Sequence, residues 1–102
     1  WIRFANARAR LIFGLSREEI AARSYADREW GNTDLAGNPL PGDKLPFALV
    51  RATCQPVTGF RHYSLDAKGR RMLLEVSGSP VLSVDGRFEA GVFVVEVLEH
   101  EQ

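Results

Sequence analysis

The pattern of apolar and polar residues predicts short helices in the first half of the chain. Residues 1–4 are expected to form a short strand, and Asn6 follows as the N-cap of a predicted two-turn helix over residues 7–13. Gly14 stands where a helix often ends on a left-handed residue, so we expect the helix to end there. A second short helix is predicted over residues 17–23.

The start of this second helix carries the most specific local signal in the first half. Ser16 and Glu19 have the spacing of a capping box, in which each side chain satisfies the backbone N–H of the other residue. Leu15 and Ile20 have the spacing of the hydrophobic staple that often accompanies such a box.

Residues 30–47 are rich in turn formers and separate the helical half from the strand half. Asp43 is a plausible N-cap for a helix over residues 44–53, where Pro46 is tolerated because the first turn needs no intrahelical donor. This helix has two adjoining apolar stripes, formed by Leu45, Leu49 and Ala52 and by Phe47, Val50 and Cys54. Two stripes predict a helix that is largely covered.

The second half predicts three strands. Residues 57–65, 70–82 and 88–98 are rich in apolar and β-branched residues, and glycine-containing turns at residues 66–69 and 84–86 separate them. Apolar and polar residues alternate along the second and third strands, so one face of the sheet is expected to be core. The pattern therefore predicts a three-stranded antiparallel meander.

Composition narrows the possible partners. The 102 residues are 45% hydrophobic, which fits one domain over residues 1–102, and the charges cancel to a formal net charge of zero. A neutral chain has no excess charge to attract nucleic acid. The single cysteine favours the cytoplasm, and no apolar run is long enough to insert in a membrane. The abrupt start on Trp1 suggests a domain cut from a longer protein.

The order of these motifs resembles that of a PAS domain. The residues that carry the resemblance are Asn6, Gly14, Leu15, Ser16, Glu19, Trp30, Asp34, Gly37, Pro46, Lys68, Gly69, Ser77, Pro80, Asp85, Gly86 and Gly91. The resemblance implies an α+β sensor fold, with an antiparallel sheet of about five strands, short helices on one face, and often a cavity between them. Two features depart from the family: its first strand has no counterpart here, and residues 96–99 replace its usual Asp-Ile-Thr ending. The unpaired edge would then be open, or filled by another segment or a partner chain.

Candidate chemistry is sparse. Cys54 lacks the motif of flavin-binding relatives, so we expect a buried or capping thiol. His62 lies on a strand, whereas haem-binding relatives carry their histidine on the preceding helix, and His100 is expected to be solvated in a polar tail. Two histidines and one cysteine offer no metal-ligand cluster, and no nucleophile or phosphate-loop motif occurs. We therefore expect no cofactor, no metal and no catalysis by this domain.

A ligand pocket is the main functional expectation. Large side chains from the predicted covering helix, the preceding segment and the strands facing them give a candidate pocket lined by Trp30, Phe47, Leu49, Val50, Phe60, His62, Leu74 and Val76. The same residues would equally make a solid core. Alternation leaves open whether Phe60 and His62 or Arg61 and Tyr63 point inward. Arg51 would hold an anionic ligand or lie solvated on the helix face.

The opposite face of the sheet suggests a partner. Several apolar residues occupy strand positions that point to the same face of the sheet as Glu75 and Glu96. The candidate dimer face consists of Leu73, Val81, Val92 and Val94. Exposed apolar patches usually mark contacts, and PAS domains commonly pair through this face, so a homodimer is expected. The alternative is a patch covered by residues that precede this chain.

Together these observations favour a sensory or regulatory domain of a bacterial-type signal-transduction protein. It would bind a small molecule, form a dimer, or both, to control an attached output domain, which would be a histidine kinase, a nucleotide cyclase or a transcription regulator. A ligand-free dimerisation module is the alternative, and a small α+β enzyme is a third hypothesis.

Overall fold

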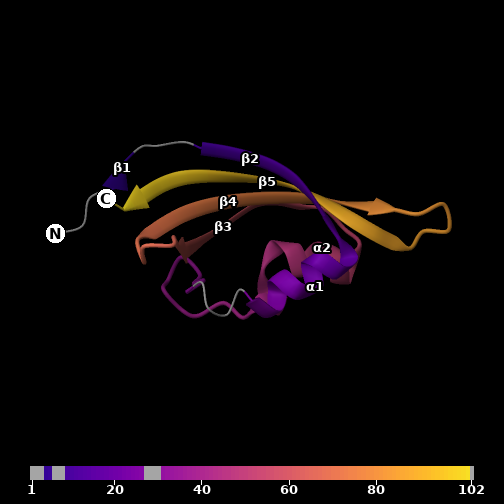
Figure 1. Ribbon diagram of the computed structural model, residues 1–102, viewed down its shortest axis with the longest axis horizontal. Coiled ribbons are helices and arrows are strands. Elements are labelled where there is room, and N and C mark those ends of the chain that lie inside the picture. The colour runs from indigo at the N-terminus through magenta and orange to yellow at the C-terminus, as the bar shows by residue number, and fades with distance from the viewer. Residues whose placement is uncertain (1–3, 6–8, 27–30, 102) are drawn as a thin grey trace.

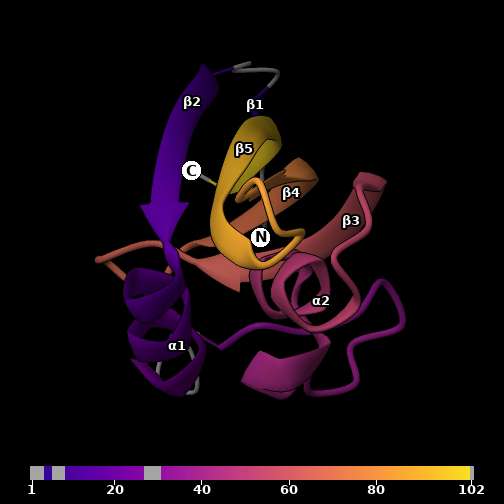
Figure 2. The ribbon, with the colours of Figure 1, turned by 90° about the vertical axis from the view of Figure 1, so that its right-hand side faces the viewer.

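The computed structural model describes residues 4–5, 9–26 and 31–101. It is an antiparallel sheet with short helices on one face (Figure 1). The elements in chain order are β1 (Phe4–Ala5), β2 (Ala9–Ser16), α1 (Arg17–Ala26), η2 (Gly42–Lys44), α2 (Pro46–Thr53), β3 (Val57–Leu65), β4 (Arg71–Leu82) and β5 (Phe88–Glu101). Figure 2 shows α1 below β2, with α2 below the strands nearer to β3.

Strand β5 organises the sheet. Both β1 and β2 pair with one edge of β5, β4 pairs with its other edge, and β3 lies beyond β4. Since β1 and β2 follow one another along the same edge, the sheet is four strands wide. The expectation of about five strands side by side is therefore corrected to four positions.

The helix predicted over residues 7–13 is wrong. Residues 9–16 form strand β2, which pairs with β5 from Ala9 opposite Val97 to Ser16 opposite Ala90. A two-turn helix is marginal by itself, whereas the free edge of β5 gives each residue of this segment a backbone partner. Gly14 accordingly lies inside a strand. Asn6 and the start of the predicted helix lie outside the described residues, and so does most of the predicted strand over residues 1–4.

The capping box is confirmed. The hydroxyl of Ser16 accepts the backbone N–H of Glu19 at 3.1 Å, and the carboxylate of Glu19 accepts the N–H of Ser16 at the same distance. Helix α1 begins directly after this serine. Leu15 and Ile20, the predicted staple, both belong to the buried core, so the box also fixes where the helix enters the core.

The predicted cap at Asp43 is wrong, although Pro46 does occupy the first turn of α2. Asp43 lies in the short 3-10 helix η2, and Leu45 is the N-cap of α2, with no side-chain cap bond. Proline disfavours helical geometry in the residue before it, and Leu45 is extended at φ −77° and ψ 155°. The predicted single helix over residues 44–53 is therefore interrupted at this residue.

The antiparallel meander is confirmed. Strand β3 has the predicted bounds, β4 begins one residue later than predicted, and β5 continues to Glu101 instead of ending at residue 98. The hairpin of β4 and β5 extends beyond the helices, at the right of Figure 1, and Val84 at its tip is fully exposed.

Phe93 of β5 lies at the centre of the core and is completely buried. Two glycines leave room for its ring: a Cβ added at Gly78 would lie 2.5 Å from the ring, and one added at Gly91 would lie 2.6 Å from it. The ring of Phe93 contacts those of Phe13 and Phe47, at centroid distances of 6.2 and 4.7 Å. The two glycines therefore let an aromatic ring lie flat on the sheet beneath α2.

We predict that Gly78→Ala destabilises the fold by about 1–3 kcal/mol, because the added methyl forces Phe93 or Val50 out of place. Gly14→Ala is the matched control, since its Cβ would meet nothing closer than a backbone oxygen at 3.9 Å. It should change the free energy of unfolding by no more than about 0.5 kcal/mol. Urea denaturation of both variants measures the difference, and equal losses would contradict the role given to the glycine.

Candidate functional site

Helix α2 supplies the apolar side of the candidate site. Phe47 and Val50 face the sheet from α2 and join Val76 of β4 and Phe93 of β5 in one buried cluster. Phe47 meets the ring of Phe93 edge-on. A polar atom placed in such an interface has few partners and loses its water, so it must find a hydrogen bond inside.

His62 is one of two buried polar side chains on β3, and Ser64 is the other. His62 is 3% exposed, whereas its neighbour Arg61 points to the opposite face and pairs with Glu75 at 2.8 Å. The alternation left open by the sequence is thus settled in favour of Phe60 and His62 pointing inward. The rings of these two residues lie 5.9 Å apart.

The two ring nitrogens of His62 have different surroundings. Nδ1 lies 3.1 Å from the backbone carbonyl oxygen of Tyr63. Nε2 is buried and has no hydrogen-bond partner among the residues that the structure describes. Burial lowers the pKa of the ring below its ordinary value, and the contact with the Tyr63 carbonyl offsets only part of this effect. A neutral, half-satisfied imidazole therefore lies under the helices.

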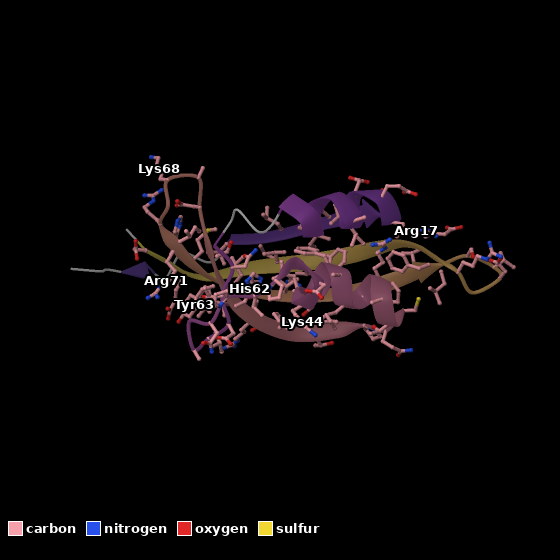
Figure 3. The ribbon with its side chains drawn as sticks, turned by 90° about the horizontal axis from the view of Figure 1, so that it is seen from below. Arg17, Lys44, His62, Tyr63, Lys68 and Arg71 are labelled. Atoms are coloured by element: carbon pink, nitrogen blue, oxygen red, sulfur yellow. The ribbon has the colours of Figure 1, made fainter. Side chains whose placement is uncertain are left out.

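The loop before α2 covers this end of β3. Thr33 and Tyr63 exchange two backbone hydrogen bonds of 3.0 Å, as an isolated antiparallel bridge. The N–H of Leu40 donates to the carbonyl of Asn32 at 2.9 Å, which closes the loop on itself. Figure 3, seen from the helical side, places His62 nearer the middle of the molecule than Tyr63.

All the residues predicted to line a pocket, except Trp30, lie on α2, β3 or β4. Trp30 lies outside the described residues. Phe47, Val50, His62 and Val76 are buried, and Leu49, Phe60 and Leu74 are half-buried. Phe47, Val50 and Val76 join one buried cluster with Leu74 packed against it, and the pocket stays a prediction. Asn32 and Ser64 are also buried nearby along the chain, and the sequence pattern had not singled them out.

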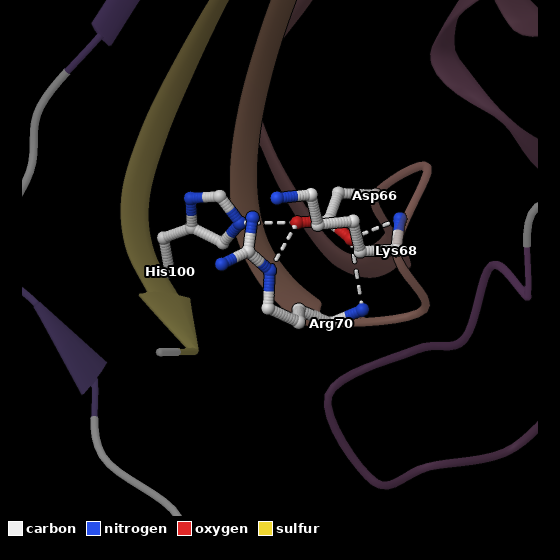
Figure 4. Close-up of polar contacts among 4 residues, drawn as sticks. All are labelled: Asp66, Lys68, Arg70 and His100. Carbon is white, nitrogen blue, oxygen red and sulfur yellow. Dashed lines mark hydrogen bonds and ion pairs between the residues drawn. The ribbon is translucent and has the colours of Figure 1, made fainter.

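A second polar cluster joins the turn after β3 to the end of β5 (Figure 4). The carboxylate of Asp66 accepts the backbone N–H groups of Lys68 and Arg70 at 2.8 and 2.9 Å, and the side chain of Arg70 at 3.0 Å. His100 donates from Nε2 to the same carboxylate at 2.7 Å. The expectation of a solvated His100 is therefore wrong: it is half-buried and bound.

These contacts stabilise the charged form of Asp66. Its pKa is held well below the usual range, first by the backbone N–H of Arg70 and then by the contacts with His100 and Lys68. The contact with His100 is an ion pair only while the imidazole is protonated. The cluster links the turn after β3 to the end of β5.

Comparison with models of protein families matches residues 1–96 to the PAS fold. The chain belongs to the PAS family. No curated protein and no solved structure matches it. PAS membership makes the chain a sensory or regulatory module, and PAS domains are generally sensory and not catalytic. The resemblance found in the order of its motifs is thereby confirmed.

The remaining candidate residues of the PAS domain have structural roles. Cys54 ends α2 in the left-handed region at φ 52°, and its N–H donates to the carbonyl of Val50 at 2.9 Å, as expected of a capping residue. Arg51 is exposed on the helix. The described residues contain no group of three or more His, Cys, Asp or Glu side chains placed to hold a metal ion. No helix in this part of the chain is long and apolar enough to cross a membrane.

The outer face of the sheet, away from the helices, carries an apolar patch. Val94 lies opposite Ser77 of β4 and Ile12 of β2, and Val92 lies two residues before it on β5. We define the outer patch as Ile12, Val81, Val92 and Val94. Ile12 is 68%, Val81 41% and Val92 43% exposed, while Val94 is half-buried. Leu73, also predicted for this face, lies further along β4. The sequence pattern missed Ile12 because it assigned that residue to a helix.

A row of charges borders the outer patch. The registers place Arg10, Glu96, Glu75 and Arg61 opposite one another across the four positions of the sheet. Glu96 and Glu75 are neighbours of like charge, and each has an arginine on its other side, at 3.9 and 2.8 Å. The row is therefore neutral as a whole.

The buried ring of His62 predicts a loss of stability in mild acid. Since its folded pKa is lowered, the unfolded chain binds the proton more readily, and stability falls as the pH drops below about 6.5. The slope approaches about 1.4 kcal/mol per pH unit. His62→Phe should remove this fall in urea denaturation between pH 7.5 and pH 5.5, and His100→Phe, the matched control, should keep it. If the free energy of unfolding of His62→Phe still fell between pH 7.5 and pH 5.5, the assignment of this pH dependence to His62 would be contradicted.

Proposed function

We propose that this PAS domain is the cytoplasmic sensory module of a larger bacterial-type signal-transduction protein. A small molecule enters between α2 and the sheet, next to His62, and changes the activity of an attached output domain. The host is a histidine kinase, a nucleotide cyclase or a transcription regulator. The domain itself acts without catalysis and without a haem or flavin cofactor.

The observation that supports this proposal is the unpartnered Nε2 of His62. A buried polar atom without a hydrogen bond costs about 1–3 kcal/mol, and no partner for Nε2 occurs among the described residues. A ligand that pairs with this atom recovers that energy and gains apolar contact with half-buried residues such as Phe60 and Leu74. Such a ligand binds one arrangement of helix and sheet better than another.

A sensor domain needs a ligand that binds one of its two conformations more tightly than the other. A ligand shifts a two-state equilibrium only by the difference of its affinities for the two states. Helix α2 contacts β3, β4 and β5, so a molecule held beneath it moves the helix relative to the strands. Strand β5 then carries the change from Phe93 toward its far end at His100.

The test of this function is native mass spectrometry of the freshly purified chain, compared with its mass after denaturation. We expect an additional non-covalent mass that disappears on denaturation, because the ligand is held only by the folded interface. Its mass identifies the compound. A chain that carries no added mass, and that acquires none from a metabolite extract, would sink the ligand-sensor proposal.

A second role, homodimerisation, is supported by the outer patch. Apolar side chains that are 41–68% exposed lie together there, beside a charged row that is neutral as a whole. The chain also has a formal net charge of zero, so two copies do not repel each other strongly. A second copy with the same patch therefore fits this face, and a dimer would pass a change in one domain to both output domains.

We predict that Val92→Arg weakens the dimer at least tenfold, because it buries an unpaired charge in the apolar contact. Val84→Arg is the matched control, since Val84 is fully exposed at the tip of the hairpin and lies outside the patch. Sedimentation velocity over a dilution series measures both. The outer patch would be ruled out as a dimer interface if the parent chain were monomeric at every concentration, or if Val92→Arg left the dimer unchanged.

A further inference from the structure

The chemistry of the ligand follows from the tautomer of His62. A backbone carbonyl oxygen only accepts hydrogen bonds, so the contact of Nδ1 with the Tyr63 carbonyl requires the proton to be on Nδ1. In a neutral imidazole the other nitrogen is then an acceptor with a lone pair. Burial keeps the ring neutral, because the charged form loses its water. Nε2 can therefore be satisfied only by a partner that donates a hydrogen bond to it.

Among the residues that the structure describes, charged groups on the neighbouring elements do not converge on Nε2 of His62. On β3, Arg61 is directed to the outer face by its pairing with Glu75. Arg51 of α2 and Asp43 and Lys44 of η2 are exposed. In the covering loop, the carboxylate of Asp34 accepts the backbone N–H of Asn38 at 2.9 Å. Among the described residues, an anionic ligand would therefore meet neither a counter-charge nor a donor at Nε2.

We propose that His62 accepts, at Nε2, a hydrogen bond from the O–H or N–H of a neutral and largely apolar small molecule. The site thus selects alcohols, phenols and comparable N–H compounds over carboxylates and over ethers of the same shape. This inference rests on the proposed sensory function and names the ligand class for the same site. The neighbouring ring of Phe60 and the apolar side chains of Leu74 and Val76 favour an aromatic or aliphatic body for the ligand.

The direct test compares ligands that differ only in the donor. Phenol and anisole form one pair, and benzyl alcohol and benzyl methyl ether form the other. Titrations followed by NMR of the ¹⁵N-labelled chain should give at least tenfold tighter binding for the donor-bearing member of each pair, since an unpaired buried acceptor penalises the ether. Benzoate should bind more weakly than phenol. Long-range ¹⁵N–¹H spectra should show the proton on Nδ1 of His62 and a shift of Nε2 when phenol binds.

His62→Phe keeps a ring of similar size but removes the acceptor. It should bind anisole about as well as the parent chain and lose the preference for phenol. His100→Phe is the matched control, because it removes the other histidine and should keep that preference. The tautomer measured on the unmodified chain tests the inference even where His62→Phe fails to fold.

Several outcomes would overturn the inference. These are equal affinity within each pair, a proton on Nε2 in the free chain, tighter binding of benzoate, an Nε2 resonance that phenol leaves unmoved, or an iron-bound absorption band on adding hemin. Binding of benzoate or hemin would overturn only the ligand class and leave the sensory function standing. Failure of every probe, together with a bare chain in native mass spectrometry, would overturn both.

Discussion

The fold depends on the space that Phe93 occupies. Its ring lies over two strand glycines, Gly78 and Gly91, where any side chain would collide with it, and it contacts Phe47 of α2. Because β5 pairs with β1, β2 and β4, the residue that seats the helix belongs to the strand that holds the sheet together. Helix packing and strand register are thus coupled at one side chain, and movement of α2 is felt by β5.

Local signals predicted much of the fold. Turns and alternation located the meander, and β3 has the predicted bounds because a strand-forming run is followed directly by the Asp66–Gly69 turn. The failure over residues 7–13 has a non-local cause: Leu11 and Ile12 suit a helix or a strand, and the pairing edge of β5 comes some eighty positions later in the chain. The interruption of the helix at Leu45 could have been predicted from the sequence, because Pro46 follows it and proline disfavours helical geometry in the residue before it.

The sequence predicted which positions belong to the candidate site, but not the burial or hydrogen bonding of His62. Helical stripes and strand parity brought Phe47, Val50 and Val76 together correctly, because burial follows periodicity. No pattern in the sequence distinguishes His62 from a solvated strand histidine, since its burial depends on the loop that docks at Thr33 and on the parity of β3. The state of each ring nitrogen is a property of tertiary contacts alone.

The two histidines show how one residue type serves two purposes in the same domain. Burial lowers the pKa of the His62 ring, and its Nε2 has no hydrogen-bond partner among the described residues. His100 donates to Asp66, whose charge is stabilised by backbone N–H groups, and so joins the end of β5 to the β3–β4 turn. His62 lies opposite Leu74 and His100 lies opposite Met72, only two residues apart on β4, so both histidines lie near the same end of the sheet. If a ligand binds at His62 as proposed, a displacement of β3 against β5 strains the contact of His100 with Asp66 or moves the end of β5 with it.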